Sequence, residues 1–179
     1  MSVLNRLRAH ATDLWLAGFI VIFDQVTKPL VRTMLAAHES VTIVPGLLNF
    51  THVQNTGAAF GILNLTDFPL KTPILITVHV IALISIGIYT VSLPQDHRLV
   101  RTGLALIMGG AIGNLIDRVR NGYVLDFVDV YWRQYHFWAF NVADAAITVG
   151  VAAIILDLLV TRGAARDREG PPLDKLETP

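Results

Sequence analysis

Apolar residues dominate four long stretches of the chain, and polar residues gather between them. The stretches run from about residue 14 to 36, 73 to 93, 99 to 116 and 141 to 160. A hydrocarbon core of about 30 Å takes roughly 20 helical residues to cross, and each stretch is close to that length or longer. The second contains ILITVHVIALISIGIYTVSL, which lacks the polar stripe that a helix of a soluble bundle shows. The pattern predicts an integral membrane protein, mainly α-helical, with four transmembrane helices.

The two longer connections between these stretches have a different pattern. Residues 41–54 (VTIVPGLLNFTHVQ) and 123–132 (YVLDFVDVYW) are rich in β-branched and aromatic residues and partly alternate with polar ones. Such runs are typical of strands, so we expect a small extracytoplasmic β-sheet. Residues 1–162 are then a single membrane domain. The polar tail 163–179 contains Pro and Gly, and we expect it to be disordered.

Composition supports a membrane protein and excludes several other classes. Hydrophobic residues make up 53% of the chain and charged residues 16%, whereas soluble domains carry about 25% charged residues. The 14 basic and 14 acidic residues balance, so we expect no nucleic acid partner. The absence of cysteine excludes a disulfide framework, a thiolate metal site and a cysteine nucleophile.

The distribution of lysine and arginine predicts the orientation in the membrane. Basic residues precede the first span, occupy the short connection between the second and third, and follow the fourth. These residues are Arg6, Arg8, Arg98, Arg101, Arg162, Arg166, Arg168 and Lys175. Because such residues favour the cytoplasmic side, both termini should be cytoplasmic and the strands should lie at the outer face. The first span resembles a signal peptide, but Asp24, Gln25 and Lys28 stand where a cleavage site would follow. We therefore expect a retained helix.

Charged residues inside spans are costly, so each needs an explanation. Asp24 and Lys28 are four residues apart on one helical face and could form a purely structural ion pair. The third span contains MGGAIGNLIDR, in which Gly109 and Gly113 have the spacing that allows a second helix to approach closely. We interpret these two glycines as packing residues.

Polar residues also gather where the third span should meet the outer interface. Asn114, Asp117 and Arg118 stand at positions i, i+3 and i+4 and share one face. Asp117 and Arg118 could simply end the helix among headgroups. Asn114 lies one turn deeper, where a side-chain amide needs hydrogen-bond partners.

The fourth span repeats this arrangement at its outer end. Asn141 and Asp144 are three residues apart, which fits a helix N-cap with an acidic residue reaching back to it. The preceding strand-like segment brings Asp126 and Asp129 to the same outer surface. Either of these two could belong to an ordinary solvated strand edge.

Several common catalytic and phosphate-binding motifs are missing. There is no HExxH pair, no GxSxG and no glycine-rich phosphate loop. Two carboxylates held close together share a proton, so that one can act as a general base while the other polarises a carbonyl. This aspartic-protease chemistry needs neither metal nor cofactor. Two alternatives remain open, a proton-coupled carrier with intramembrane acids and a structural subunit that packs through its glycines.

Five linked segments resemble the lipoprotein signal peptidases, also called type II or prolipoprotein signal peptidases. They are DQVTK at 24–28, QNTGAAFGIL at 54–63, GGAIGNLIDR at 109–118, GYVLDFVDV at 122–130 and FNVADAAI at 140–147. The segments keep the order of the family and cover about residues 14–160. Together on a four-span pattern they are highly specific.

The resemblance implies an aspartic endopeptidase of the bacterial inner membrane. Its substrates would be diacylglyceryl-modified prolipoproteins, cut on the amino side of the lipidated cysteine, and its other contacts would be membrane lipids. We expect a monomer without a cofactor or metal. The resemblance assigns catalysis to Asp126 and Asp144, and it assigns substrate binding to Asn55, Asn114, Arg118 and Asn141 and a structural polar role to Asp24, Lys28 and Asp117.

Overall fold

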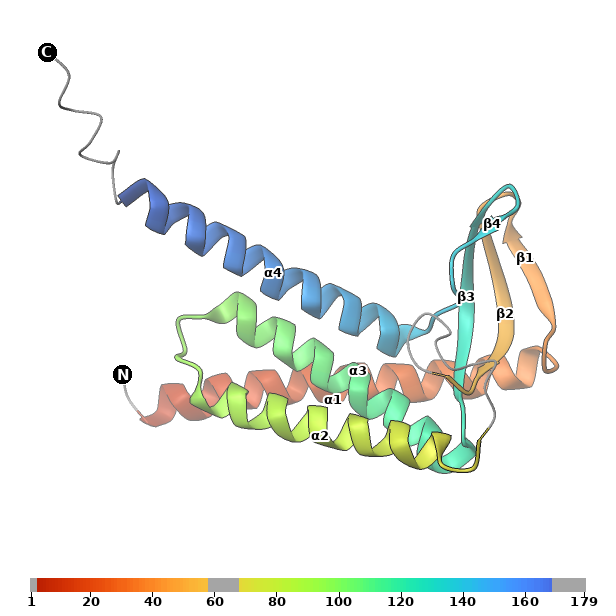
Figure 1. The fold of residues 1–179 in the computed structure, drawn as a ribbon, viewed down its shortest axis with the longest axis horizontal. Coiled ribbons are helices and arrows are strands. Elements are labelled where there is room, and N and C mark those ends of the chain that lie inside the picture. The colour runs from red at the N-terminus through yellow and green to blue at the C-terminus, as the bar shows by residue number, and fades with distance from the viewer. Residues whose placement is uncertain (1–2, 58–67, 169–179) are drawn as a thin grey trace, which may run out of the picture.

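The computed structural model describes residues 3–57 and 68–168, which form four helices and four strands (Figure 1). The helices are α1 (Val3–Met34), α2 (Lys71–Ser92), α3 (Arg98–Asn121) and α4 (Val142–Arg168). The strands are β1 (Ser40–Val44), β2 (Leu48–Asn55), β3 (Val124–Trp132) and β4 (Tyr135–His136). Strands β1, β2 and β3 lie after α1 and after α3 in the segments that the sequence predicts, about 41–54 and 123–132, whereas the sequence pattern does not predict the short strand β4.

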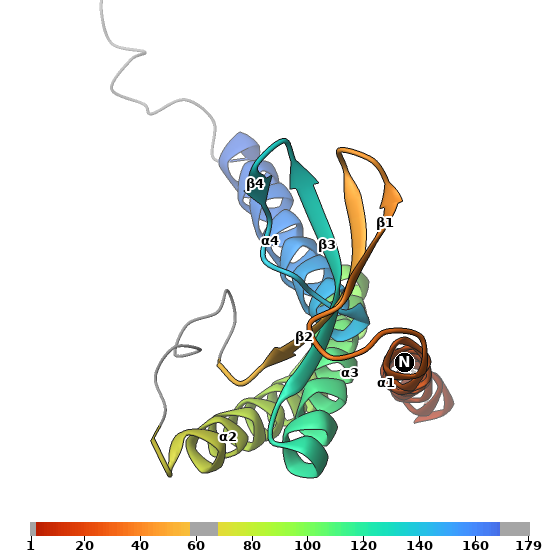
Figure 2. The same cartoon turned by 90° about the vertical axis from the view of Figure 1, so that its right-hand side faces the viewer.

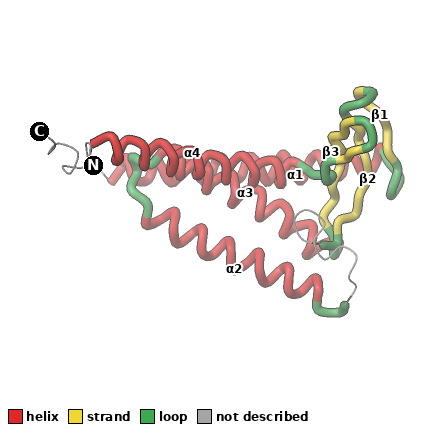
Figure 3. The backbone as a smooth tube through the Cα atoms, turned by 45° about the horizontal axis from the view of Figure 1, so that its top comes forward, coloured by secondary structure: helices red, strands yellow, loops and turns green. Residues whose placement is uncertain are grey.

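All four helices are long and apolar enough to cross a membrane. The candidate spans are Ala11–Met34, Lys71–Ser92, Arg98–Asn121 and Val142–Thr161. Helix α3 packs against each of the other three, and α2 lies at the edge of the bundle (Figure 3). Helix α3 is the most buried, whereas α2 exposes most of its apolar side chains. Apolar side chains that face outward on such helices are suited to lipid. The predicted fold class, four transmembrane helices with a small sheet, is confirmed.

The helices extend beyond the apolar stretches that predict them. Helix α1 begins at Val3 rather than near residue 14, and α3 continues to Asn121 rather than 116. Helix α4 continues to Arg168, so residues 163–168 of the expected tail are helical, and 169–179 lie outside the described residues. Hydropathy reports which turns suit a hydrocarbon environment, and polar turns at either end can be helical without being apolar.

The glycines of the third span allow close helix contacts, as predicted. A Cβ atom on Gly109 would lie 2.7 Å from the carbonyl oxygen of Ala17 in α1. A Cβ atom on Gly113 would lie 2.7 Å from Oδ2 of Asp24, also in α1. Both glycines thus let α1 approach α3, and Gly113 does so at the level of Asp24.

The four strands form one antiparallel sheet in the order β1-β2-β3-β4, which lies across one end of the helical bundle (Figure 2). In the central pair, Val53 lies opposite Asp126 and Asn55 lies opposite Val124. The turn between β1 and β2 contains Gly46, whose φ of 81° is in the left-handed region that favours glycine. Strand pairing therefore brings the QNTG segment next to the segment VLDF.

Two local features attach the sheet to the bundle. Gly122 ends α3 in a left-handed conformation with φ of 77°, and its N–H donates to the carbonyl of Arg118 at 3.0 Å. The chain then turns directly into β3. A buried apolar cluster below the sheet joins the end of α1 to this strand and consists of Val31, Leu35, Leu125 and Phe127.

The helix ends are divided between two sides. The start of α1, the connection between α2 and α3, and the end of α4 lie at the end of the bundle opposite the sheet (Figure 1). This is the alternation that the basic residues predict. That these helix ends lie in the cytoplasm stays a prediction.

Candidate active site

Asp126 is buried in the middle of β3, with a relative exposure of 2%. Its two carboxylate oxygens accept hydrogen bonds from two asparagine side chains. Asn55 Nδ2 donates to Oδ2 at 2.9 Å, and Asn141 Nδ2 donates to Oδ1 at 2.7 Å. The neighbours Leu125 and Phe127 are buried in the apolar cluster below the sheet. Because successive strand residues face opposite ways, their packing directs Asp126 toward the start of α4.

Asp144 lies in the first turn of α4 and is held by both backbone and side-chain donors. Its Oδ1 accepts from Asn114 Nδ2 at 2.7 Å, and its Oδ2 accepts from the backbone N–H of Asn141 at 3.3 Å. The N–H of Asp144 in turn donates to Asn141 Oδ1 at 2.9 Å. These reciprocal bonds form a capping box, so the capping interpretation is correct. The cap is compatible with a role in chemistry, because the side chain of Asn141 also donates to the carboxylate of Asp126.

Asn141 connects the two acids and is itself fully buried. Its side-chain amide donates to Asp126, while its backbone N–H donates to Asp144. The amide nitrogen also lies 3.3 Å from Oδ1 of Asn114, whose own amide donates to Asp144. A continuous set of amide hydrogen bonds therefore joins two carboxylates that are 18 positions apart in sequence.

A second buried cluster is centred on Lys28 and adjoins these hydrogen bonds at Asn114. The ammonium group of Lys28 lies 2.8 Å from Asp24 and 3.1 Å from Asp117, and it donates to Asn114 Oδ1 at 3.1 Å. These three partners use the three N–H groups of the lysine. Lys28 and Asp24 are fully buried, and this arrangement compensates their desolvation.

The two acids of this cluster also hold backbone groups next to the site. Asp24 Oδ1 accepts from the N–H of Ala143 at 3.1 Å, one residue before Asp144. Asp117 Oδ2 accepts from the N–H of Leu125 at 3.2 Å, one residue before Asp126. The cluster thus fixes the backbone at both candidate catalytic residues. The sequence suggests the ion pair of Asp24 and Lys28 but gives no sign of these backbone contacts.

Arg118 approaches the carboxylates from the end of α3. Its Nη2 donates to the carbonyl of Gly57 at 2.7 Å, and its charge interacts with those of Asp126 and Asp144. Among the described residues, neither Nε nor Nη1 of this buried guanidinium has a hydrogen-bond partner. Buried donors without a partner are unusual and are suited to an incoming acceptor.

Asn55 also organises the loop that follows β2. Its side-chain oxygen accepts from the N–H of Gly57 at 2.9 Å, while its amide donates to Asp126. The next described contact comes from Lys71 at the start of α2, whose Nζ donates to Thr56 Oγ1 at 2.9 Å. Sequence reasoning missed Lys71, because it precedes an apolar span and looks like an interfacial residue. The remainder of the QNTGAAFGIL segment, from residue 58, lies outside the described residues.

Asp129 is not part of this arrangement. Its carboxylate is paired with His136 Nδ1 at 2.9 Å and accepts from Asn49 Nδ2 at 3.0 Å. Asp129 thus joins three strands of the sheet, β2, β3 and β4. Of the two acids in VLDFVDV, the structure brings only Asp126 to Asn141.

The environment of Asp126 favours its protonated form. Burial, followed by the negative charge of Asp144, raises the pKa of Asp126 from its usual value of 3.8 to about 7. The hydrogen bonds from Asn55 and Asn141 and the charge of Lys28 oppose this rise in pKa. Two neighbouring carboxyls that share one proton are suited to acid and base roles in one reaction.

Comparisons with known proteins identify relatives over most of the chain. The family model of signal peptidase (SPase) II matches residues 16–160. A lipoprotein signal peptidase of Geobacter metallireducens is 48% identical over 139 residues, which cover 78% of this chain and 85% of that protein. One of Geobacter sulfurreducens is 46% identical over 139 residues, covering 78% and 86%.

Two solved bacterial membrane enzymes have the same fold. One has a TM-score of 0.77 and 34% identity, with 90% of this chain and 94% of that chain covered. The other has a TM-score of 0.73 and 38% identity, with 83% and 93% covered. By sequence and by fold, the chain belongs to the signal peptidase II family and is a membrane protease.

Proposed function

We propose that the chain is an aspartic endopeptidase that removes the signal peptide from diacylglyceryl-modified prolipoproteins, cleaving on the amino side of the lipidated cysteine. The observation that carries the proposal is the bridge of Asn141 between Asp126 and Asp144. The lipoprotein signal peptidases similar to this chain support the choice of substrate.

In the proposed reaction, Asp126 enters protonated and Asp144 enters ionised. The two acids share one proton, and we place it on Asp126 because Asp144 lies at a helix N-terminus, where negative charge is stabilised, and accepts from the N–H of Asn141. Asp144 takes a proton from water as the water oxygen attacks the scissile carbonyl carbon. Asp126 gives its proton to the carbonyl oxygen, which produces a neutral gem-diol.

The second step restores the dyad. The carbon–nitrogen bond breaks while Asp144 returns its proton to the leaving nitrogen, and a gem-diol hydroxyl returns a proton to Asp126. The products are a carboxylic acid and a free amine at the cysteine. All proton transfers stay within two side chains, and no metal or cofactor takes part.

The remaining polar residues divide into three proposed roles. Arg118 and Asn55 bind substrate carbonyls, because two donors of Arg118 have no partner within residues 3–57 and 68–168 and Asn55 connects the loop at Gly57 to Asp126. Asn114 and Asn141 orient the acids and complete the cleft. Asp24, Lys28 and Asp117 hold the backbone at both acids.

The location of the acids fits a substrate anchored in the bilayer. They lie where the helices meet the sheet, so a scissile bond next to a lipidated cysteine would arrive at this depth. We propose that this end faces the outside of the bacterial inner membrane, with both termini in the cytoplasm, in accord with the basic residues at the opposite end. We also propose that the enzyme acts as a monomer, since the residues of the site come from one chain.

The deciding experiment follows the mass of a lipidated prolipoprotein incubated with the purified full chain. Wild type should release the signal peptide, and unlipidated substrate should remain intact. Asp126→Asn and Asp144→Asn should each abolish release, while Asp129→Asn should retain most of it. Full turnover by Asp144→Asn would remove that residue from the dyad, and no turnover by wild type would favour a carrier or a structural subunit.

A further inference from the structure

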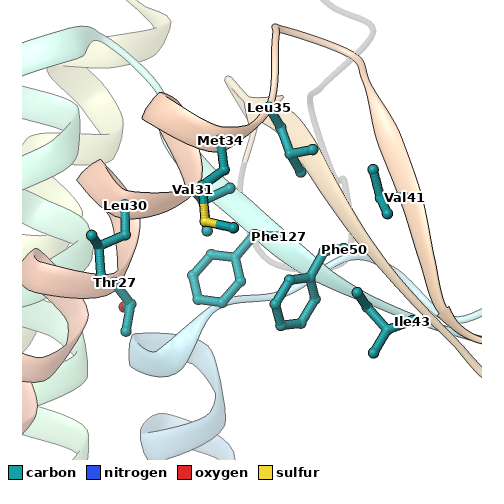
Figure 4. A pocket seen from close by; sticks show the side chains of 9 residues that line it. All are labelled: Thr27, Leu30, Val31, Met34, Leu35, Val41, Ile43, Phe50 and Phe127. Carbon is teal, nitrogen blue, oxygen red and sulfur yellow. The ribbon is translucent and has the colours of Figure 1, made fainter.

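A groove lies where the last two turns of α1 approach the sheet (Figure 4). It is lined by Phe127 of β3, whose neighbour Asp126 faces the other side of the strand. Its volume is about 360 Å³, within the range of about 300–1,000 Å³ typical of ligand pockets. The walls include Leu30 and Met34 of α1, Val41 and Ile43 of β1, and Phe50 and Phe127 of the central strands.

The lining of the groove is apolar and offers a ligand no hydrogen bond from a side chain. Of the described residues that line it, only Thr27 has a polar side chain. Its hydroxyl donates within α1, to the carbonyl of Phe23 at 2.9 Å or of Asp24 at 3.0 Å. A site of this kind suits a hydrocarbon and does not suit a peptide backbone or a polar headgroup.

The groove is continuous with the surface of α1 that faces lipid. The candidate span of this helix ends at Met34, so the groove lies at the depth where the hydrocarbon core meets the interface. Val26, Leu30 and Met34 are exposed along this part of α1, and Ile43 is exposed on the sheet opposite. An acyl chain of the adjacent bilayer could enter without crossing a polar region.

The groove is also separated from the proposed catalytic acids. Phe127 faces the groove, whereas its neighbour Asp126 bonds to Asn55 and Asn141 on the other face of β3. A substrate positioned at Asp126 would have to pass around the strand to reach this space. The occupant is therefore better assigned to the bilayer than to the substrate.

We propose that this groove binds one acyl chain of a bilayer phospholipid, which fills the space between α1 and the sheet. Burial of the chain against Phe50 and Phe127 anchors the sheet to the membrane. Since Phe127 adjoins Asp126 in β3, the same lipid supports the strand that carries the acid. Lipid binding here does not depend on the proposed peptidase activity.

The test counts the lipid that the protein retains. The full chain is reconstituted in dioleoylphosphatidylcholine vesicles, extracted in mild detergent and weighed by native mass spectrometry. Wild type should retain one phosphatidylcholine. Ile43→Trp fills the groove and should reduce retention by at least about tenfold, because less apolar surface of the chain is buried. Val44→Trp, on the adjacent residue that does not line the groove, should retain the lipid.

Three outcomes would overturn the proposal. Wild type could retain no lipid, or Ile43→Trp could retain as much as wild type. A diacylglyceryl peptide that displaces the phosphatidylcholine would assign the groove to the substrate instead. If Ile43→Trp fails to enter the membrane, Ile43→Asn replaces it, since a polar side chain in the groove should weaken retention in the same way.

Discussion

Lys28 donates a hydrogen bond to Asn114 across 3.1 Å, and this contact connects the buried ion cluster to the proposed catalytic acids. Asn114 uses its oxygen for Lys28 and its amide for Asp144. The amide of Asn114 is therefore oriented by the lysine, so that its N–H faces the acid. The buried charge of Lys28 in the first span thus determines the hydrogen bonding of Asp144 at the start of the fourth.

Removing the charge of Lys28 should destabilise the protein strongly. Lys28→Met leaves Asp24 and Asp117 buried without a cation, and loss of one partner in a buried ion pair typically costs about 3–5 kcal/mol. The midpoint of thermal unfolding in detergent measures this. Adding Asp24→Asn and Asp117→Asn to Lys28→Met should recover part of the loss. A single Lys28→Met variant that unfolds at the wild-type temperature would contradict the account.

Asn141 should affect activity and stability separately, because it has two functions. Asn141→Ser keeps a good N-cap for α4 but loses the amide donor to Asp126. We expect prolipoprotein cleavage to fall by about 10- to 100-fold, and the unfolding temperature to fall moderately because the buried Oδ1 of Asp126 loses a donor. Asn141→Ala loses both functions and should cost about 1 kcal/mol more in stability. Equal activity in wild type and Asn141→Ser would show that the amide does not position Asp126.

The raised pKa of Asp126 predicts an unusual dependence of stability on pH. Between about pH 4 and about pH 7 the folded protein holds a proton on Asp126 that the unfolded chain has released, so stability falls as pH rises. An ordinary aspartate in an ion pair shows the opposite slope. Thermal unfolding at about pH 5 and about pH 8 should therefore favour the lower pH, and Asp126→Asn should reduce the difference.

The rate of prolipoprotein cleavage should depend on the same proton of Asp126. Cleavage should decline as pH rises above about 7, because Asp126 then lacks the proton that it donates to the carbonyl oxygen. Initial rates of lipidated substrate cleavage across this range measure the effect. A rate that keeps rising well above pH 7 would contradict the assignment of Asp126 as the acid.

Gly113 should be sensitive to a single methyl group. A Cβ atom there would lie 2.7 Å from Oδ2 of Asp24 and would displace a carboxylate that holds both Lys28 and the N–H of Ala143. Gly113→Ala should lower stability by about 1–3 kcal/mol, as overpacking usually does. Gly87→Ala is the matched control, since a Cβ atom at Gly87 in α2 has no neighbour within 4 Å. Similar unfolding temperatures for both variants would exclude the predicted overlap.

The sequence by itself determined the number of spans, the fold class and the family. Hydropathy is a local property, so each apolar stretch, including ILITVHVIALISIGIYTVSL, predicts a span without knowledge of its neighbours. The Asn141 and Asp144 spacing likewise predicts the capping box, which depends on one helical turn. The resemblance of five motifs then named Asp126 and Asp144, which the residues alone left among several candidate acids.

Only the tertiary structure decided how these residues meet. Strand pairing places Asn55 at Asp126, and the contact of α1 with α3 places Lys28 at Asn114. Asp24 reaches Ala143 across a separation of 119 residues, for which no local pattern exists. Such contacts arise because helices and strands far apart in the chain pack against one another, and buried polar groups must then find their partners across those interfaces. The groove beside Phe127 has the same origin, since its walls come from four separate elements.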